Sequence, residues 1–206
     1  MSDKSHWDRV YNDTAGDARG WFQQQPVRSL AFIGASGAGP DATIIDVGGG
    51  ASGLTANLLS KGFSDLWLLD ISATALAAAR KSLGTDAARI HWVEADVNGV
   101  KLPPAHFDIW HDRAVFHFLT DVAAREAYVA KACASVKPGG HLIIATFAED
   151  GPEQCSGLPV ARYDAASLQA QFAECCELLH TEKAAHATPA GKLQQFRYCL
   201  LRRKGS

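Results

Sequence analysis

The chain has 206 residues, of which 47% are hydrophobic and 20% charged, with a formal net charge of -2. These values are typical of a folded globular protein and exclude a chain that is disordered throughout. The balance of charge gives no basic surface, so neither nucleic acid nor an anionic membrane is expected as a partner. The length suits one domain, residues 1–206, with a core at 40–203 behind an N-terminal helical segment at 1–38.

The distribution of apolar residues along the chain indicates the cellular compartment of the protein. No stretch is apolar enough to span a bilayer, and the first ten residues, MSDKSHWDRV, carry charges where a signal peptide has an apolar run. We therefore expect a cytoplasmic protein; its oligomeric state is left open, and a monomer is compatible with the sequence.

The cysteines show neither CxxC nor zinc-finger spacing. In a reducing compartment this predicts free thiols, several of them buried as small apolar side chains, and no metal site. Cys155 differs from the others because it lies in a polar loop. The remaining four are Cys133, Cys175, Cys176 and Cys199.

The N-terminal segment is expected to form two helices, at residues 3–11 and 26–35. From residue 43 onward, short apolar runs alternate with helical patterns bounded by glycine, serine or aspartate. Strands are predicted at 43–47, 66–70, 91–95, 107–111, 141–147, 176–185 and 193–202. Helices are predicted at 54–61, 73–83, 121–136 and 165–173, with Ser72 and Asp121 as N-caps.

Strands that alternate with helices imply right-handed crossovers. The predicted fold is therefore α/β: a doubly wound, Rossmann-like sheet of seven strands, mostly parallel, with helices on both faces. A short turn at residues 188–191, TPAG, separates the last two strands, and this predicts a C-terminal antiparallel hairpin.

A glycine-rich loop, DVGGGASG at residues 46–53, follows the first predicted strand and opens a helix, the setting of a cofactor loop. Gly48, Gly49 and Gly50 allow a sharp turn and admit a ligand where a Cβ would obstruct it. The same letters satisfy GxGxxG, and Asp70 follows at nearly the spacing of a dinucleotide fingerprint. An NAD-dependent oxidoreductase and a non-catalytic nucleotide-binding module are therefore alternatives at this point.

Asp46 discriminates between these interpretations. A dinucleotide places its anionic pyrophosphate at the loop and the helix N-terminus, where a carboxylate would repel it. S-adenosylmethionine instead carries a sulfonium and an α-ammonium, which a carboxylate attracts. The position of Asp46 thus favours S-adenosylmethionine as the cofactor.

Two further acidic residues end successive predicted strands. Asp70 is placed to accept hydrogen bonds from both ribose hydroxyls, with Ile71 beside the adenine ring. Asp96, followed by Val97, is placed to accept from the adenine amine. Because the carboxyl ends of parallel strands meet at one edge of the sheet, these side chains predict a nucleoside site.

The segments IIDVGGGASGL, LWLLDIS, WVEADV, FDIWHD and KPGGHLIIATF resemble the class I S-adenosylmethionine-dependent methyltransferase family, in its small, single-domain, type 11/12-like form, over about residues 40–203. The segment from Trp7 to Tyr11, with Trp21, is similar to the lid of small methyltransferases in this family, including a group that methylates protein lysines. The resemblance implies these cofactor-binding residues: Asp46, Gly48, Gly49, Gly50, Ser52, Asp70, Ile71, Asp96, Val97, His111, Trp7, Tyr11 and Trp21.

In this family the residues after the fourth strand usually face the transferred methyl group. His111 and His117 are therefore candidate general bases, and Arg113 is a third catalytic candidate, placed to hold a carboxylate of the acceptor. The polar loop at 147–163 is expected to shape the acceptor pocket. The residues expected to contact the acceptor are Arg113, His117, Cys155 and Arg162.

The run after the fourth strand lacks the Asn/Asp-Pro-Pro-aromatic motif of enzymes that methylate base amino groups or glutamine. Asp112-Arg113 echoes only in part the Asp-Lys-Gly run of the lysine-methylating group. The first hypothesis is thus an S-adenosylmethionine-dependent methyltransferase with a small-molecule acceptor, and a protein-lysine methyltransferase is the alternative.

Overall fold

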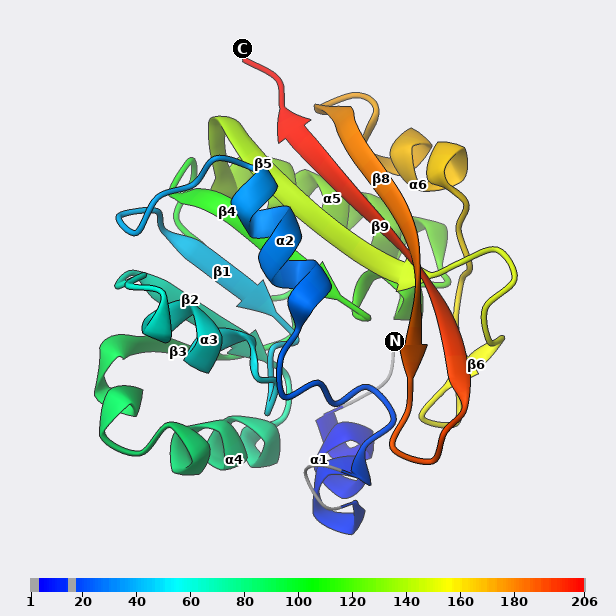
Figure 1. The fold of residues 1–206 in the computed structure, drawn as a ribbon. Helices are drawn as coiled ribbons and strands as arrows, with labels where there is room; N and C mark the ends of the chain where they lie inside the picture. Colours follow the sequence, from blue (N-terminus) through cyan, green and yellow to red (C-terminus); the bar gives the residue numbers. More distant parts are fainter. Residues whose placement is uncertain (1–3, 15–17, 206) are drawn as a thin grey trace.

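A computed structural model describes residues 4–14 and 18–205. The main sheet has the order β3-β2-β1-β4-β5-β9-β8 (Figure 1). Neighbouring strands from β3 across to β5 are parallel, whereas β9 runs antiparallel to both β5 and β8. The strands of this sheet are β1 (Ile44–Val47), β2 (Leu66–Asp70), β3 (Ile90–Glu94), β4 (Phe107–Arg113), β5 (Val136–Phe147), β8 (Cys176–Ala187) and β9 (Leu193–Arg203).

The predicted fold class is confirmed, including the C-terminal hairpin. A small separate pair, β6 (Gln154–Cys155) and β7 (Leu158–Pro159), lies in the loop after β5. The helices are α1 (Lys4–Asp13), α2 (Val27–Ala35), α3 (Leu54–Ser60), α4 (Ala73–Leu83), α5 (Val122–Ser135) and α6 (Ala165–Phe172), with short 3-10 turns η2 (Gly84–Arg89) and η3 (Phe116–Phe118). None of the described helices is long and apolar enough to cross a membrane.

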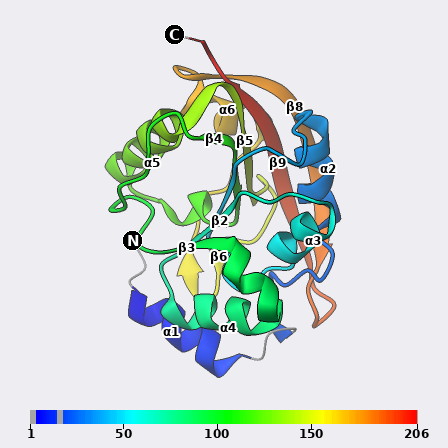
Figure 2. The ribbon, with the colours of Figure 1, turned by 90° about the vertical axis from the view of Figure 1, so that its left-hand side faces the viewer.

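The helices cover both faces of the sheet, and an apolar cluster fills the space on each side. One cluster packs residues of α2, α3 and α4 against the sheet, and the other packs α5 and α6. Figure 2 shows α2 and α3 on one side of the strands and α5 on the other. Ser72 and Asp121 cap α4 and α5 as predicted, each accepting a backbone hydrogen bond from the third residue after it.

β5 begins earlier than expected. The sequence indicates a turn at residues 138–140, Pro-Gly-Gly, and a strand only from His141. In the structure the turn bulges out within the strand, because β5 advances from Val136 to His141 while its partner β4 advances only from Phe107 to Ile109.

α1 packs on the start of α4. The Asp8 carboxylate accepts hydrogen bonds from the Ser72 hydroxyl at 2.6 Å and the Thr74 amide at 3.3 Å, and Lys4 forms an ion pair with Glu94 at 2.5 Å. The predicted first helix, at 3–11, is present over residues 4–11; residues 1–3 and 15–17 of the N-terminal segment lie outside the described residues.

The expectation that every cysteine is a free thiol is wrong for two of them. Cys133 at the end of α5 and Cys175 before β8 form a disulfide. The Cys176 sulfur lies 3.9 Å from that of Cys133 and 3.7 Å from that of Cys175, so three sulfurs gather in a group that the sequence spacing did not predict. These sulfurs could hold a metal ion only with the disulfide reduced, because the ligand form of cysteine is the thiolate. Folding brings these residues together across a sequence separation of 42. Cys155, Cys176 and Cys199 are free thiols.

A buried polar network joins β4 to α5. The Trp110 indole donates to the Tyr128 hydroxyl at 2.8 Å, and this hydroxyl donates in turn to the Asp112 carboxylate. Asp112 also accepts from the Val115 and Phe116 amides, which shapes the turn that follows β4. Burial raises the pKa of Asp112 to about 6.

Replacing Tyr128 with phenylalanine should lower the free energy of unfolding by about 1–3 kcal/mol, because a buried carboxylate and a buried indole each lose a partner. Urea denaturation measures the change. Tyr163→Phe is the matched control, since that tyrosine is also buried and its hydroxyl has no hydrogen-bond partner among the described residues. Equal stability of the two variants would contradict the role given to the network.

Candidate active site

A cavity of about 100 Å³ lies at the carboxyl ends of the parallel strands, between the tips of β1 to β4 and the N-terminal segment. The predicted site residues in its lining are Trp7, Tyr11, Trp21, Gly48, Asp70, Ile71, Asp96, Val97, Arg113 and Cys155. Residues that the sequence analysis missed complete the wall and are all apolar: Val47, Leu69, Ala95, Ala114, Val115, Phe118 and Leu119. Most of these apolar residues are sequence neighbours of a predicted site residue, so their place in the cavity wall could have been predicted from the sequence.

The glycine loop rests on the carboxylate of Asp46. One Asp46 oxygen lies 2.7 Å from His111 Nδ1, and the other accepts a hydrogen bond from the Ser52 hydroxyl at 3.3 Å. The backbone of Gly49 lies so close to the Asp46 carboxylate that a Cβ on Gly49 would collide with it. Asp46 is 4% exposed and does not line the cavity, so it supports the loop from beneath. Gly49, Gly50 and Ser52 likewise form the body of the loop and not the cavity wall.

The structure corrects the expected role of His111. Its ring is buried between β1 and α2, where Nδ1 contacts Asp46 and Nε2 contacts the Ser29 hydroxyl at 2.8 Å. Both ring nitrogens are therefore occupied, and His111 is absent from the cavity lining. It positions Asp46 and has no nitrogen left for an acceptor proton.

His117 is corrected in the same way. It is fully buried beside Phe147, whose amide donates to His117 Nδ1 at 3.3 Å. Burial, with a smaller effect of the Arg113 charge, lowers the pKa of His117 to about 3. A neutral, enclosed imidazole of this kind is a poor general base near neutral pH.

Asp70 and Asp96 both reach the cavity from strand ends, as predicted. One oxygen of Asp70 accepts from the Ser72 amide at 2.8 Å, and one oxygen of Asp96 accepts from the Asn98 amide at 2.8 Å. Burial raises the pKa of Asp70 to about 7, and the charges of Asp46 and Asp8 add to the effect.

Aromatic rings from the N-terminal segment cover this cavity. Trp7 packs edge-on against Trp21 and Phe118, with ring centroids 6.2 and 5.1 Å apart, and Tyr11 packs edge-on against Trp21. The Tyr11 hydroxyl reaches the glycine loop, where a Cβ on Gly50 would collide with it. The N-terminal segment thus lies directly over the loop.

The N-terminal segment is held by contacts within itself and by contacts to the β8–β9 hairpin. The Arg19 guanidinium lies over the Tyr11 ring at 4.4 Å and donates to the Tyr11 carbonyl at 3.0 Å. His186, near the tip of the β8–β9 hairpin, contacts the Gly20 carbonyl at 2.8 Å and the Gln23 side chain at 3.1 Å. The hairpin therefore braces the cover of the cavity.

A second cavity, of about 490 Å³, adjoins the first and shares Trp21, Ala114 and Cys155 with it. Ala114 has a positive φ of 74°, a conformation that non-glycine residues rarely adopt and that is concentrated at functional sites. Burial raises the pKa of the Cys155 thiol to about 11, so this thiol is neutral. Further walls of the second cavity come from α1, the end of β5 and β9.

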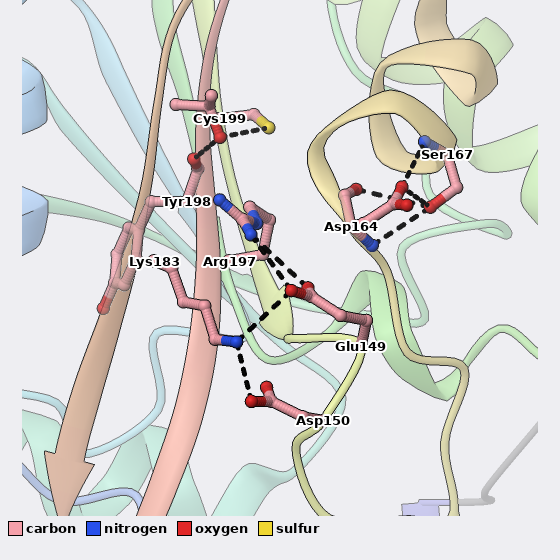
Figure 3. A network of polar contacts seen from close by, with 9 residues as sticks. Glu149, Asp150, Asp164, Ser167, Lys183, Arg197, Tyr198 and Cys199 are labelled. Carbon is pink, nitrogen blue, oxygen red and sulfur yellow. Dashed lines mark hydrogen bonds and ion pairs between the residues drawn. The ribbon is translucent and has the colours of Figure 1, made fainter.

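The loop after β5 is anchored at its base. Glu149 accepts from Lys183 and Arg197, and Lys183 also contacts Asp150 at 2.7 Å, which ties the loop to the β8–β9 hairpin (Figure 3). Arg162 contacts the Gly151 carbonyl and Glu153 within the loop. The structure therefore corrects the expected acceptor role of Arg162: it braces the loop and lines neither cavity.

Comparison with known proteins gives a family match over the region that carries the loop and the strand ends. Residues 44–140 match the family model described as a methyltransferase domain. The malonyl-[acyl-carrier protein] O-methyltransferase of Enterobacter lignolyticus is 34% identical over 112 residues, which are 53% of this chain and 40% of that protein. The ubiquinone/menaquinone biosynthesis C-methyltransferase of Shewanella halifaxensis is 29% identical over 122 residues, covering 57% and 47%. The chain thus spans less than half the length of these curated relatives.

Solved structures share the fold over nearly the whole chain. The Burkholderia thailandensis 1,6-didemethyltoxoflavin-N1-methyltransferase, solved with S-adenosylhomocysteine, has a TM-score of 0.75 at 20% identity, covering 98% of this chain and 87% of that one. The Bradyrhizobium japonicum N-methyltransferase NodS, also solved with S-adenosylhomocysteine, has a TM-score of 0.73 at 13% identity, covering 96% and 98%. Residues 44–140, which carry the glycine loop and the strand ends, thus match a methyltransferase domain, and the chain shares the fold of these two methyltransferases.

Proposed function

We propose that the protein is an S-adenosylmethionine-dependent methyltransferase that acts on a small-molecule acceptor. The observation that carries this proposal is the meeting of Asp70, Asp96 and the glycine loop in one cavity beneath an aromatic cover. The names of the relatives, a C-methyltransferase of ubiquinone/menaquinone biosynthesis and a malonyl-[acyl-carrier protein] O-methyltransferase, agree with an acceptor group that is not an amino-acid side chain.

The cavity suits the parts of S-adenosylmethionine. Asp70 would accept hydrogen bonds from the ribose hydroxyls, Asp96 would accept from the adenine amine, and Ile71 and Val97 would cover the ring. Gly48 has a positive φ of 65° and brings bare backbone to the cavity, where the methionine end would lie. The cofactor supplies an activated methyl group on a sulfonium.

The protein's own contribution to the reaction is alignment and exclusion of water. Neither His111 nor His117 reaches either cavity, so neither of these two predicted bases is placed to remove an acceptor proton. The second cavity would hold the acceptor, and Ala114 and Cys155 at the junction would lie between it and the methyl group. An oxidoreductase is disfavoured, because the Asp46 carboxylate beneath the loop would repel a pyrophosphate.

The N-terminal segment would act as a lid. Because its aromatic rings lie over the cavity, the segment would move outward to admit a nucleoside. Its contacts to α4 and to the hairpin tip include hydrogen bonds from the Ser72 hydroxyl to Asp8 and between Gln23 and His186, which can re-form after opening.

Binding of the cofactor product is the direct test. S-adenosylhomocysteine should bind with micromolar affinity in calorimetry, whereas NAD should show no binding under the same conditions. Asp96→Ala should weaken the S-adenosylhomocysteine complex, and Asp41→Ala, an exposed aspartate outside the cavity, should not. Binding of NAD without binding of S-adenosylhomocysteine would refute the proposed function.

Asp70→Asn should separate stability from cofactor binding. In the unfolded chain Asp70 ionises near pH 3.8, but in the folded protein only near pH 7. The parent therefore loses stability as pH rises between these values, by up to about 4 kcal/mol, and asparagine avoids this cost. Urea denaturation should find the variant more stable than the parent at about pH 8 and no more stable at about pH 3.5.

The same Asp70→Asn variant should bind S-adenosylhomocysteine about 1.5–3 kcal/mol more weakly, because the charged acceptor for the ribose hydroxyls is gone. In the parent, affinity should fall as pH drops below about 7 and Asp70 takes up a proton. Calorimetry across this range measures both effects. If the Asp70→Asn variant bound S-adenosylhomocysteine with parental affinity, Asp70 would not be the acceptor for the ribose hydroxyls.

The lid predicts protection of the N-terminal segment. Saturating S-adenosylhomocysteine should slow tryptic cleavage after Arg9 and Arg19, while cleavage after the exposed Lys204 near the C-terminus should keep its rate. Asp8→Ala, which removes the contacts to Ser72 and Thr74, should speed cleavage in the absence of ligand. Mass spectrometry of the fragments follows each site. Equal rates with and without ligand would contradict the lid.

A further inference from the structure

The second cavity and its junction with the first are bordered by arginines that form no ion pair among the residues the structure describes. Arg9 and Arg19 line the second cavity, and Arg113 lines the first beside the shared junction residues. None of the three forms an ion pair with a carboxylate among the described residues. Asp13 also lines the second cavity, but it lies beyond ion-pair distance of all three.

Arg113 is held rigidly, with one nitrogen left over. Its Nε donates to the Tyr198 hydroxyl at 3.1 Å, its Nη1 donates to the Trp21 carbonyl at 2.9 Å, and its guanidinium lies 4.6 Å from the centre of the Phe196 ring. Its Nη2 is buried and has no hydrogen-bond partner. A buried charged donor without a partner is costly, so its retention points to an oxygen supplied by a ligand.

The surroundings of Arg113 indicate whether this oxygen belongs to the cofactor or to the methyl acceptor. Arg113 ends β4 and contacts Tyr198 and Phe196 on β9, on the side of the sheet away from β2 and β3. Asp70 and Asp96, the nucleoside residues, follow β2 and β3. Within the first cavity Arg113 therefore lies on the side away from the nucleoside residues, beside Ala114 and Cys155, which are shared with the second cavity. Trp21, Phe147 and Phe196 provide aromatic walls of that second cavity.

We propose that the methyl acceptor is a planar aromatic molecule that carries a carboxylate, which the free Nη2 of Arg113 binds. This inference rests on the proposed methyltransferase function. The aromatic walls would hold the ring, and the unpaired charges of Arg19 and Arg113 would attract the anion. The same charges would repel a lysine ammonium, so a protein lysine is disfavoured as the acceptor.

Matched acids and amides test the proposal on the protein saturated with S-adenosylhomocysteine. The probes are para-hydroxybenzoate and indoleacetate, each beside its neutral carboxamide, titrated by calorimetry at about pH 8. Each acid should bind about tenfold more tightly than its amide, or better. Equal affinities, or no binding by either acid, would overturn the proposal.

Variants assign the preference to Arg113. Arg113→Met should remove the preference for the acids, and Arg113→Lys should restore only part of it, because an ammonium lacks the planar fork. Arg89→Met is the control: Arg89 is exposed, pairs with Asp86, and lines neither cavity, so the preference should persist. A preference that survives in a folded Arg113→Met variant, with folding checked by thermal melting, would overturn the assignment.

The cofactor also carries a carboxylate, and a further comparison separates this source. Methylthioadenosine lacks the amino-acid end of S-adenosylhomocysteine. If Arg113→Met binds both compounds with parental affinity, the result supports the assignment of Arg113 to the acceptor. If the variant binds only S-adenosylhomocysteine more weakly, Arg113 binds the carboxylate of the cofactor, and the proposal is overturned. Failure of the parent to bind either compound would instead refute the proposed function, so the two failures are distinguishable.

Discussion

The contact between the Asp46 carboxylate and the backbone of Gly49 governs the geometry of the whole site. Asp46 comes from β1, its partner His111 from β4, and Ser29, which completes the chain of hydrogen bonds, from α2. All three are buried, so the loop cannot shift without exposing unpaired polar groups. A side chain on Gly49 would displace the carboxylate, which explains why the middle glycine of the run is needed even though it lines no cavity.

The site gathers charges that the rest of the fold leaves uncompensated. Asp70 is buried near two other carboxylates, while Arg19 and the partly buried Arg113 have no acidic partner in the described part of the chain. Each arrangement costs stability in the ligand-free protein, and a ligand with hydroxyls and an anion would offset the cost on binding. Burial of the apolar clusters on the two faces of the sheet stabilises the fold and offsets the cost of these buried charges.

Sequence reasoning identified the sheet, the loop and the strand-end acids because each depends on local chain geometry: glycines at a tight turn, acids where parallel strands end. It misjudged groups whose partners are distant in the chain. Nothing near His111 indicates that Ser29 will occupy its second nitrogen. Likewise, Cys133 and Cys175 meet only because α5 ends beside the start of β8. The acceptor wall was open to prediction, since Phe196 and Tyr198 alternate along β9 and therefore share one face.

The β8–β9 hairpin, at the edge of the sheet, contacts both Arg113 and the lid segment. Its residues Phe196 and Tyr198 support Arg113, and His186 near its tip grips the lid segment. β8 is the last strand of the sheet and has no further neighbour in it. Changes in hairpin length or tip sequence can therefore accumulate without disturbing the cofactor loop at the centre. In evolutionary terms the hairpin is an exchangeable module, through which descendants of one scaffold could acquire new acceptors and matching lid behaviour together.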